Sequence, residues 1–108
     1  MPKAKGYPHI QTIVVLMPPG YQLAEKIDEM GISAQELASR MKVSLKTVKS
    51  ILTAKKPVTS NLAKKIESAT KMSADFMLRC EERYRAAIEF VRTHPEFQVQ
   101  SFETTTNN

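Results

Sequence analysis

The stretch that most constrains the fold is residues 33–53, SAQELASRMKVSLKTVKSILT, which predicts two short helices joined by a tight turn. Ser33 is followed three residues later by Glu36, the capping-box pattern that satisfies free backbone N–H groups at the start of a helix. After a turn at residues 42–43, Ser44 is expected to cap the second helix. Two short helices with such a connection are typical of a helix-turn-helix.

Apolar residues in both helices recur at spacings of three and four, so each helix has one side that can be buried. The expected buried residues are Leu37, Ala38, Met41, Leu45, Val48, Ile51 and Leu52. Ala38 has to be small, because the two helices cross close to it. The opposite side of the second helix is polar and basic, with Lys46, Lys49, Ser50 and Thr53. A helix that lies in a DNA major groove needs a side of this kind.

Positive charge is concentrated in the same part of the chain. The formal net charge is +5, but residues 33–65 contain eight basic residues against one acidic residue, whereas the remainder has eight basic and ten acidic residues. Such a local excess favours binding to nucleic-acid phosphates, since each neutralised phosphate releases counterions. The alternative is a solvated, lysine-rich surface without a partner.

The flanking segments predict three more helices and two short strands. The expected helices are residues 19–30, 60–70 and 73–93, and the expected strands are residues 10–16 and 96–102. The fold class is therefore all-α, a five-helix helix-turn-helix domain with short terminal strands, whose pairing within or between chains is left open. We expect residues 1–17 to form an N-terminal arm, residues 18–93 the helix-turn-helix domain, and residues 94–108 a partly flexible extension.

The last predicted helix is longer than one small core requires. Its apolar residues are Phe76, Met77, Cys80, Tyr84, Ala87, Ile88 and Val91. Their number favours a dimer contact along this helix, and the alternative is a helix that covers its own core.

Nothing in the sequence predicts an enzyme. His9 and His94 are far apart, and neither has a metal ligand at the usual spacing, so we expect surface histidines, no metal and no cofactor. Cys80 is expected to be a packed core thiol, and a single cysteine fits a reducing cytoplasm. The acidic pair at residues 81–82 is interpreted as part of the solvent-exposed, or wet, side of its helix. The apolar run at residues 13–17 is too short for a signal or membrane segment.

Residues 18–84 resemble the HigA-type antitoxins, which are lambda-repressor-like proteins of the Xre/Cro helix-turn-helix class. The most specific parts are Pro19-Gly20, the KKPVT segment at residues 55–59, and the SADF…RY segment at residues 73–84. The resemblance implies a bacterial homodimer that neutralises a RelE-like, mRNA-cleaving toxin and represses its own operon at a palindromic operator. The alternatives are a stand-alone, phage-type Xre regulator without a toxin partner, and an RNA-binding or structural adaptor.

The helix-turn-helix interpretation and the apolar side of the last helix assign the sites. The expected contacts to double-stranded DNA are Ser33, Gln35, Ser44, Lys46, Thr47, Lys49, Ser50, Lys55 and Lys56, and the expected dimer contacts are Phe76, Cys80, Tyr84, Ile88 and Val91. The toxin would meet the acidic surface of the first and fifth helices. The family pattern has Gln at residue 34, Gly at residue 42 and Asn-Gly at residues 53–54, where this chain has Ala34, Lys42 and Thr53-Ala54. A left-handed Lys42 would cost about 1 kcal/mol relative to Gly.

Overall fold

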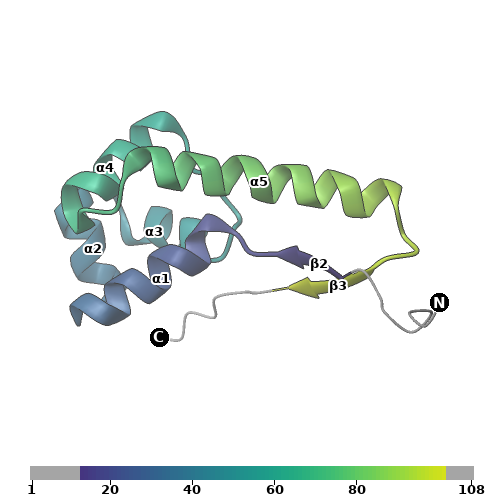
Figure 1. The fold of residues 1–108 in the computed structure, drawn as a ribbon. Helices are drawn as coiled ribbons and strands as arrows, with labels where there is room; N and C mark the ends of the chain where they lie inside the picture. The colour runs from purple at the N-terminus through teal and green to yellow at the C-terminus, as the bar shows by residue number, and fades with distance from the viewer. Residues whose placement is uncertain (1–12, 102–108) are drawn as a thin grey trace.

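A computed structural model describes residues 13–101 as five helices and one small sheet. The helices are α1 (Pro19–Met30), α2 (Ala34–Met41), α3 (Leu45–Leu52), α4 (Ser60–Thr70) and α5 (Ala74–Thr93), and the strands are β2 (Ile13–Leu16) and β3 (Gln98–Ser101). Helices α1 to α4 gather around the first part of α5, while the rest of α5 and the sheet extend away from them (Figure 1). The predicted five-helix class with short terminal strands is confirmed.

Side-chain hydroxyls mark the start of four helices. The capping oxygens accept backbone N–H groups three residues on, at 3.1 Å for Ser33 and Glu36, 3.1 Å for Ser44 and Thr47, 3.3 Å for Thr59 and Leu62, and 3.2 Å for Ser73 and Phe76. The carboxylate of Glu36 accepts a hydrogen bond from Arg40 at 3.0 Å, so this residue also stabilises α2 through an i,i+4 ion pair. The helix starts therefore lie where local sequence predicted them.

Left-handed residues follow four of the helices. Gly31 ends α1 with φ 71°, Lys42 ends α2 with φ 60°, Lys71 ends α4 with φ 72°, and Ala54, two residues after α3, has φ 64°. The expected left-handed conformation of Lys42 is confirmed. A non-glycine residue in this conformation costs roughly 1–2 kcal/mol, and Ala54 occupies the position at which the family pattern has glycine.

The core lies between all five helices. Its fully buried large side chains are Leu23, Leu37, Val48, Ile51, Ile66 and Met77. One expected core residue, Leu45, is only half-buried. Thr70 is buried in addition, and its hydroxyl donates to the carbonyl oxygen of Ile66 at 2.8 Å, so this polar side chain is satisfied within its own helix.

Gly20 permits a close approach between the start of α1 and the end of α3. A Cβ atom at this position would lie 2.2 Å from the carbonyl oxygen of Ile51 and 2.7 Å from that of Leu52. Both distances are far inside van der Waals contact, so a side chain here would push the two helices apart. Gly20, in the first turn of α1, is thus a packing requirement.

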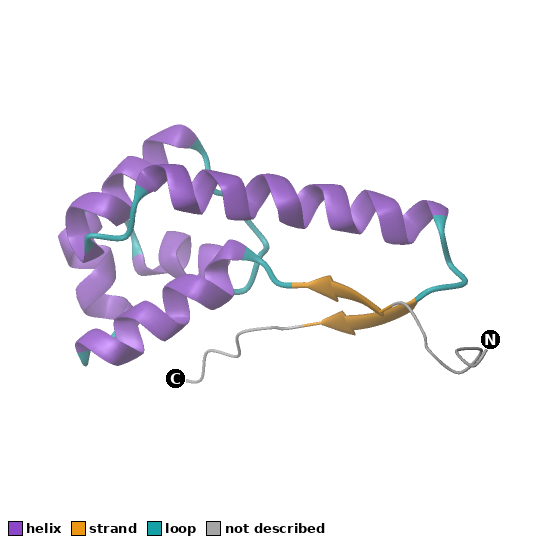
Figure 2. Cartoon of the chain, in the orientation of Figure 1, coloured by secondary structure: helices purple, strands orange, loops and turns teal. Residues whose placement is uncertain are grey.

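Strands β2 and β3 pair with each other in parallel within one chain. Ile13 lies opposite Gln98 and Leu16 opposite Ser101, and the helical domain forms the connection between the two strands (Figure 2). This in-chain pairing answers the question that the sequence left open. Residues 10–12 and 102 of the expected strands, the residues 1–9 with His9, and the C-terminal tail lie outside the described residues.

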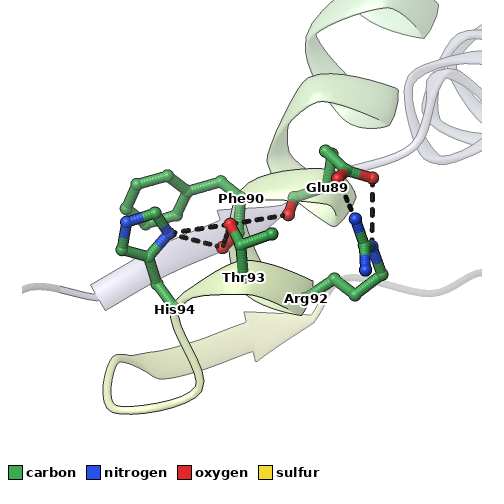
Figure 3. Close-up of polar contacts among 5 residues, drawn as sticks. All are labelled: Glu89, Phe90, Arg92, Thr93 and His94. Carbon is green, nitrogen blue, oxygen red and sulfur yellow. Dashed lines mark hydrogen bonds and ion pairs between the residues drawn. The ribbon is translucent and has the colours of Figure 1, made fainter.

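The chain leaves α5 through a small aromatic cluster (Figure 3). The His94 ring stacks on Phe90 at 4.0 Å between centroids, and its Nδ1 lies 3.0 Å from both the Phe90 carbonyl oxygen and the Thr93 hydroxyl. Within the last turn of α5, Arg92 donates a hydrogen bond to the Glu89 carboxylate. This bond raises the pKa of Arg92, and burial lowers the same pKa by a smaller amount. His94 was expected to be a surface histidine. It is half-buried, and its backbone N–H donates to the Val91 carbonyl oxygen at the end of α5.

Candidate nucleic-acid interface

The polar side of α3 forms one continuous surface. Val48, Ile51 and Leu52 point into the core, so the opposite side of the helix is left outside, as its 3.6-residue period requires. The hollow on that side is lined by Leu45, Lys46, Lys49, Ser50, Thr53 and Lys55. The four polar residues predicted for this side are therefore brought together, and Lys55 joins them from the following loop.

Two of the predicted contact residues have a structural role as well. The Ser44 hydroxyl accepts the Thr47 backbone N–H at 3.1 Å and lies 3.0 Å from the Thr47 hydroxyl. These bonds hold the first turn of α3, which is the end of a recognition helix that reaches the bases in helix-turn-helix proteins. Ser44 and Thr47 thus set the position of Lys46 between them.

The start of α2 borders a second hollow. It is lined by Ser33, Gln35, Glu36, Ser39 and Arg40. The first backbone N–H groups of a helix lack partners inside the helix and carry partial positive charge, which favours a phosphate. Arg40 is committed elsewhere, because its guanidinium bonds to Glu36 at 3.0 Å and to the Ala69 carbonyl oxygen at 3.5 Å. Ser33 and Gln35 therefore remain the predicted phosphate contacts at this end.

The loop after α3 is folded back onto that helix. The backbone N–H groups of Lys55 and Lys56 both donate to the carbonyl oxygen of Ser50, at 2.8 and 3.1 Å. Their side chains stay exposed beside the α3 surface. The backbone is thus held while two cationic side chains are presented to solvent, an arrangement suited to phosphate contacts.

The same loop is anchored to α5 by a residue that the sequence interpretation missed. Val58 is buried, and its backbone N–H donates to Oε1 of Glu81 at 3.1 Å. The Glu81 carboxylate also pairs with Arg85, and its side chain is only 13% exposed. Interpreting Glu81 as part of the wet side of its helix was therefore wrong, whereas Glu82 is exposed as expected. A contact across 23 residues leaves no periodic signal that would have revealed it.

The predicted dimer contacts lie along α5 but differ in burial. Cys80 is 6% exposed and packs inside its own chain, which confirms the expected core thiol. The other four residues, Phe76, Tyr84, Ile88 and Val91, are half-buried. Phe90, near the end of the helix, is 39% exposed. A single chain does not test the dimer, so this assignment stays a prediction.

Other kinds of site are not found in the part of the chain that the structure describes. Within residues 13–101, no group of three or more His, Cys, Asp or Glu side chains could hold a metal ion. Among the helices described, none is long and apolar enough to cross a membrane.

The five helices include α3, which is capped at its start and presents a polar side to solvent, and the basic loop after α3 lies beside that side. This arrangement defines a helix-turn-helix protein. The solved structure of the Pseudomonas aeruginosa antitoxin HigA with the higBA promoter matches with a TM-score of 0.68 and 26% identity, covering 75% of this chain and 89% of that chain. P. aeruginosa PA4674 with its 28-bp operator DNA matches with a TM-score of 0.69 and 24% identity, covering 75% and 90%. No protein-family model and no curated protein matches the sequence. The chain has the HigA-type helix-turn-helix fold, as its sequence resemblance predicted.

Proposed function

We propose that this chain is a DNA-binding antitoxin that represses its own operon and neutralises a ribonuclease toxin. The observation that carries the proposal is the α3 surface, which gathers Lys46, Lys49 and Ser50 around one hollow. It occurs in a fold shared with an antitoxin whose structure was solved with its promoter. Basic and hydroxyl side chains on an exposed helix suit the acceptors of a DNA major groove.

On DNA, helix α3 would enter the major groove. Lys46, Lys49 and Ser50 would face base edges, with Thr47 nearby and Ser44 at the helix start. The exposed Lys55 and Lys56 would hold backbone phosphate beside the groove, where they set position and carry no sequence information. The start of α2, with Ser33 and Gln35, would hold a second phosphate.

The operator-binding form would be a homodimer. Two copies would place their α3 helices in successive major grooves, about 34 Å apart, and the symmetry of the pair would match a palindromic operator. The contacts on α5 would be Phe76, Tyr84, Ile88 and Val91. Cys80, the fifth predicted contact, is only 6% exposed and packs inside its own chain, so it would not face the partner.

The toxin would bind away from the α3 surface. Outside residues 33–65 the chain is slightly acidic, and on α1 the side chains of Glu25, Asp28 and Glu29 are exposed. Lys26 neutralises part of this charge by pairing with Glu29 at 3.5 Å. A basic, RelE-like ribonuclease would be attracted to the remaining carboxylates of α1. On α5, Glu81 and Glu89 already pair with arginines, so that helix would add little attraction. Both activities would take place in the bacterial cytoplasm.

Two observations test this function. The chain should shift DNA from the region upstream of its own gene at salt concentrations at which a scrambled sequence of equal length stays free. The product of an adjacent gene, a small basic ribonuclease, should co-purify with it. Binding to upstream DNA without such a neighbour would identify the second candidate, a stand-alone Xre-type regulator, which the net charge of +5 also favours.

A further inference from the structure

Leu45 is an aliphatic residue at the edge of the polar side of α3. The helical period predicts it in the core, but it is half-buried, and it lines the hollow of the α3 surface beside Lys46 and Lys49. Partly buried apolar residues such as Val43 pack against the core cluster, and within the described chain Leu45 is not one of them. An aliphatic side chain that faces water contributes free energy when a partner covers it. Leu45 is therefore an apolar group available to a ligand of this surface.

The first turn of α3 holds Leu45 in a fixed position. The Ser44 hydroxyl accepts the Thr47 backbone N–H at 3.1 Å and lies 3.0 Å from the Thr47 hydroxyl. These bonds enclose Leu45 and Lys46, which follow the cap directly. In helix-turn-helix proteins the first turn of the recognition helix is the part that reaches base edges. One aliphatic and one cationic side chain thus lie side by side in the turn that would meet the bases.

The chemistry of base edges limits what Leu45 can contact there. The apolar group by which a base is recognised in the major groove is the C5-methyl of thymine, and the other distinguishing groups are hydrogen-bond donors and acceptors. An aliphatic side chain that covers a donor or acceptor removes its water and gives no hydrogen bond in return. Contact with a methyl group has no such cost and buries apolar area on both sides.

We propose that Leu45 covers the C5-methyl group of one thymine in each half of the operator. The inference rests on the proposed DNA-binding function and adds a specificity-determining residue that this function does not assign. The ammonium groups of Lys46 and Lys49 donate to acceptors on base edges, whereas Leu45 distinguishes thymine from cytosine by its methyl group. Each half of the operator should therefore contain a thymine within reach of the bases that the two lysines contact.

The charge around Leu45 favours a DNA duplex over a protein as the partner that covers it. The hollow is lined by three lysines, Lys46, Lys49 and Lys55, and none of the described residues that line it is acidic. A basic ribonuclease would be repelled by these side chains, whereas the phosphates on both sides of a major groove are attracted to them. The duplex that neutralises the lysines would thus also cover Leu45.

Replacement of thymine with uracil tests the contact, because deoxyuridine lacks only the methyl group of thymidine. Each thymine of the operator upstream of the gene is replaced singly, and binding of the full-length chain is measured by fluorescence anisotropy. For one thymine in each half, the unaltered chain should bind about fourfold more weakly, the loss expected when one methyl-sized apolar group is left uncovered. In Leu45→Ala the same replacement should have almost no effect. Leu45→Met keeps an aliphatic side chain of similar volume and should retain most of the uracil effect.

Val43→Ala is the matched control, because Val43 is also half-buried but packs against the core. At matched folded concentration it should bind the thymine and uracil duplexes with the same ratio as the unaltered chain. The inference is overturned if the unaltered chain binds the operator and no uracil weakens binding, or if the uracil effect persists in Leu45→Ala. Either result would leave the proposed function standing. An unaltered chain that does not bind the upstream DNA at all would overturn the proposed function, and the thymine contact with it.

Discussion

The backbone N–H of Val58 donates a hydrogen bond to Oε1 of Glu81 at 3.1 Å, which joins the loop after α3 to the middle of α5. The loop carries Lys55 and Lys56, so this bond determines where two of the predicted phosphate contacts lie. An exposed acidic residue could be replaced freely, but Glu81 is mostly covered and also pairs with Arg85. The helix that is expected to dimerise thereby also positions the loop that we propose to contact DNA.

Replacing Glu81 with Ala should therefore destabilise the fold. The Val58 N–H would lose its acceptor, and we expect the free energy of unfolding to fall by about 1–2 kcal/mol. Glu81→Gln keeps an oxygen acceptor and should recover about half of that loss. Urea denaturation measures both variants. The matched control is the exposed neighbour Glu82, whose replacement with Ala should change stability by less than about 0.5 kcal/mol; an equal loss for both would contradict the anchoring role.

Gly20 should tolerate no side chain. In Gly20→Ala the added Cβ would meet the carbonyl oxygen of Ile51, which lies 2.2 Å from its ideal position. Relief requires α1 and α3 to separate, at a cost of about 1–3 kcal/mol. Gly31→Ala is the contrasting variant, because its Cβ would meet nothing within 4 Å. Gly31→Ala should lower the free energy of unfolding only by the cost of a left-handed alanine, about 1 kcal/mol.

The two glycine variants also differ in what they do to DNA binding. Gly20→Ala displaces the end of the predicted recognition helix and should weaken operator binding of the folded fraction. Gly31→Ala lies between α1 and α2 and should leave binding nearly unchanged. Thermal unfolding followed by gel shifts at matched folded concentration separates the two effects, and equal binding by both variants would count against a displaced α3.

Glycine at the left-handed positions after α2 and α3 should stabilise the protein. Lys42→Gly and Ala54→Gly each remove a left-handed penalty of roughly 1–2 kcal/mol, and the greater freedom of the unfolded chain returns about half of this gain. We expect a net increase of about 0.5 kcal/mol in the free energy of unfolding for each variant. Ala86→Gly, on the exposed side of α5, should instead lower it by about 0.5–1 kcal/mol. Chemical denaturation of the three variants in parallel gives the sign of each change.

Local features of this fold could be predicted from the sequence alone. The Ser33 and Ser44 caps and the burial of Val48 depend on residues within one or two turns of each other, whereas the left-handed Lys42 was implied by the family resemblance. Propensity, capping and hydrophobic period act over that range. The same reasoning placed the polar side of α3 correctly, because the period of a helix determines which residues share a side.

Contacts between distant segments could not be predicted. The Glu81 bond to Val58, the approach of Gly20 to Ile51 and the in-chain pairing of β2 with β3 join residues that are far apart in sequence. Each depends on how elements distant in sequence come together, which leaves no repeat in the sequence. Glu81 illustrates the consequence, because a charged residue next to another charged residue is usually exposed, and tertiary packing overrode that expectation.

The central claim is that the polar side of α3 reads the operator while the following loop holds its backbone. It is tested most directly by the salt dependence of binding by Lys49→Ala and Lys56→Ala, measured by fluorescence anisotropy on the operator and on a scrambled duplex. Lys49→Ala should lose affinity chiefly for the operator, by about 1–3 kcal/mol, and so relax sequence preference. Lys56→Ala should weaken both duplexes alike and reduce the salt slope by about one. Loss of preference in Lys56→Ala with unchanged preference in Lys49→Ala would contradict the account.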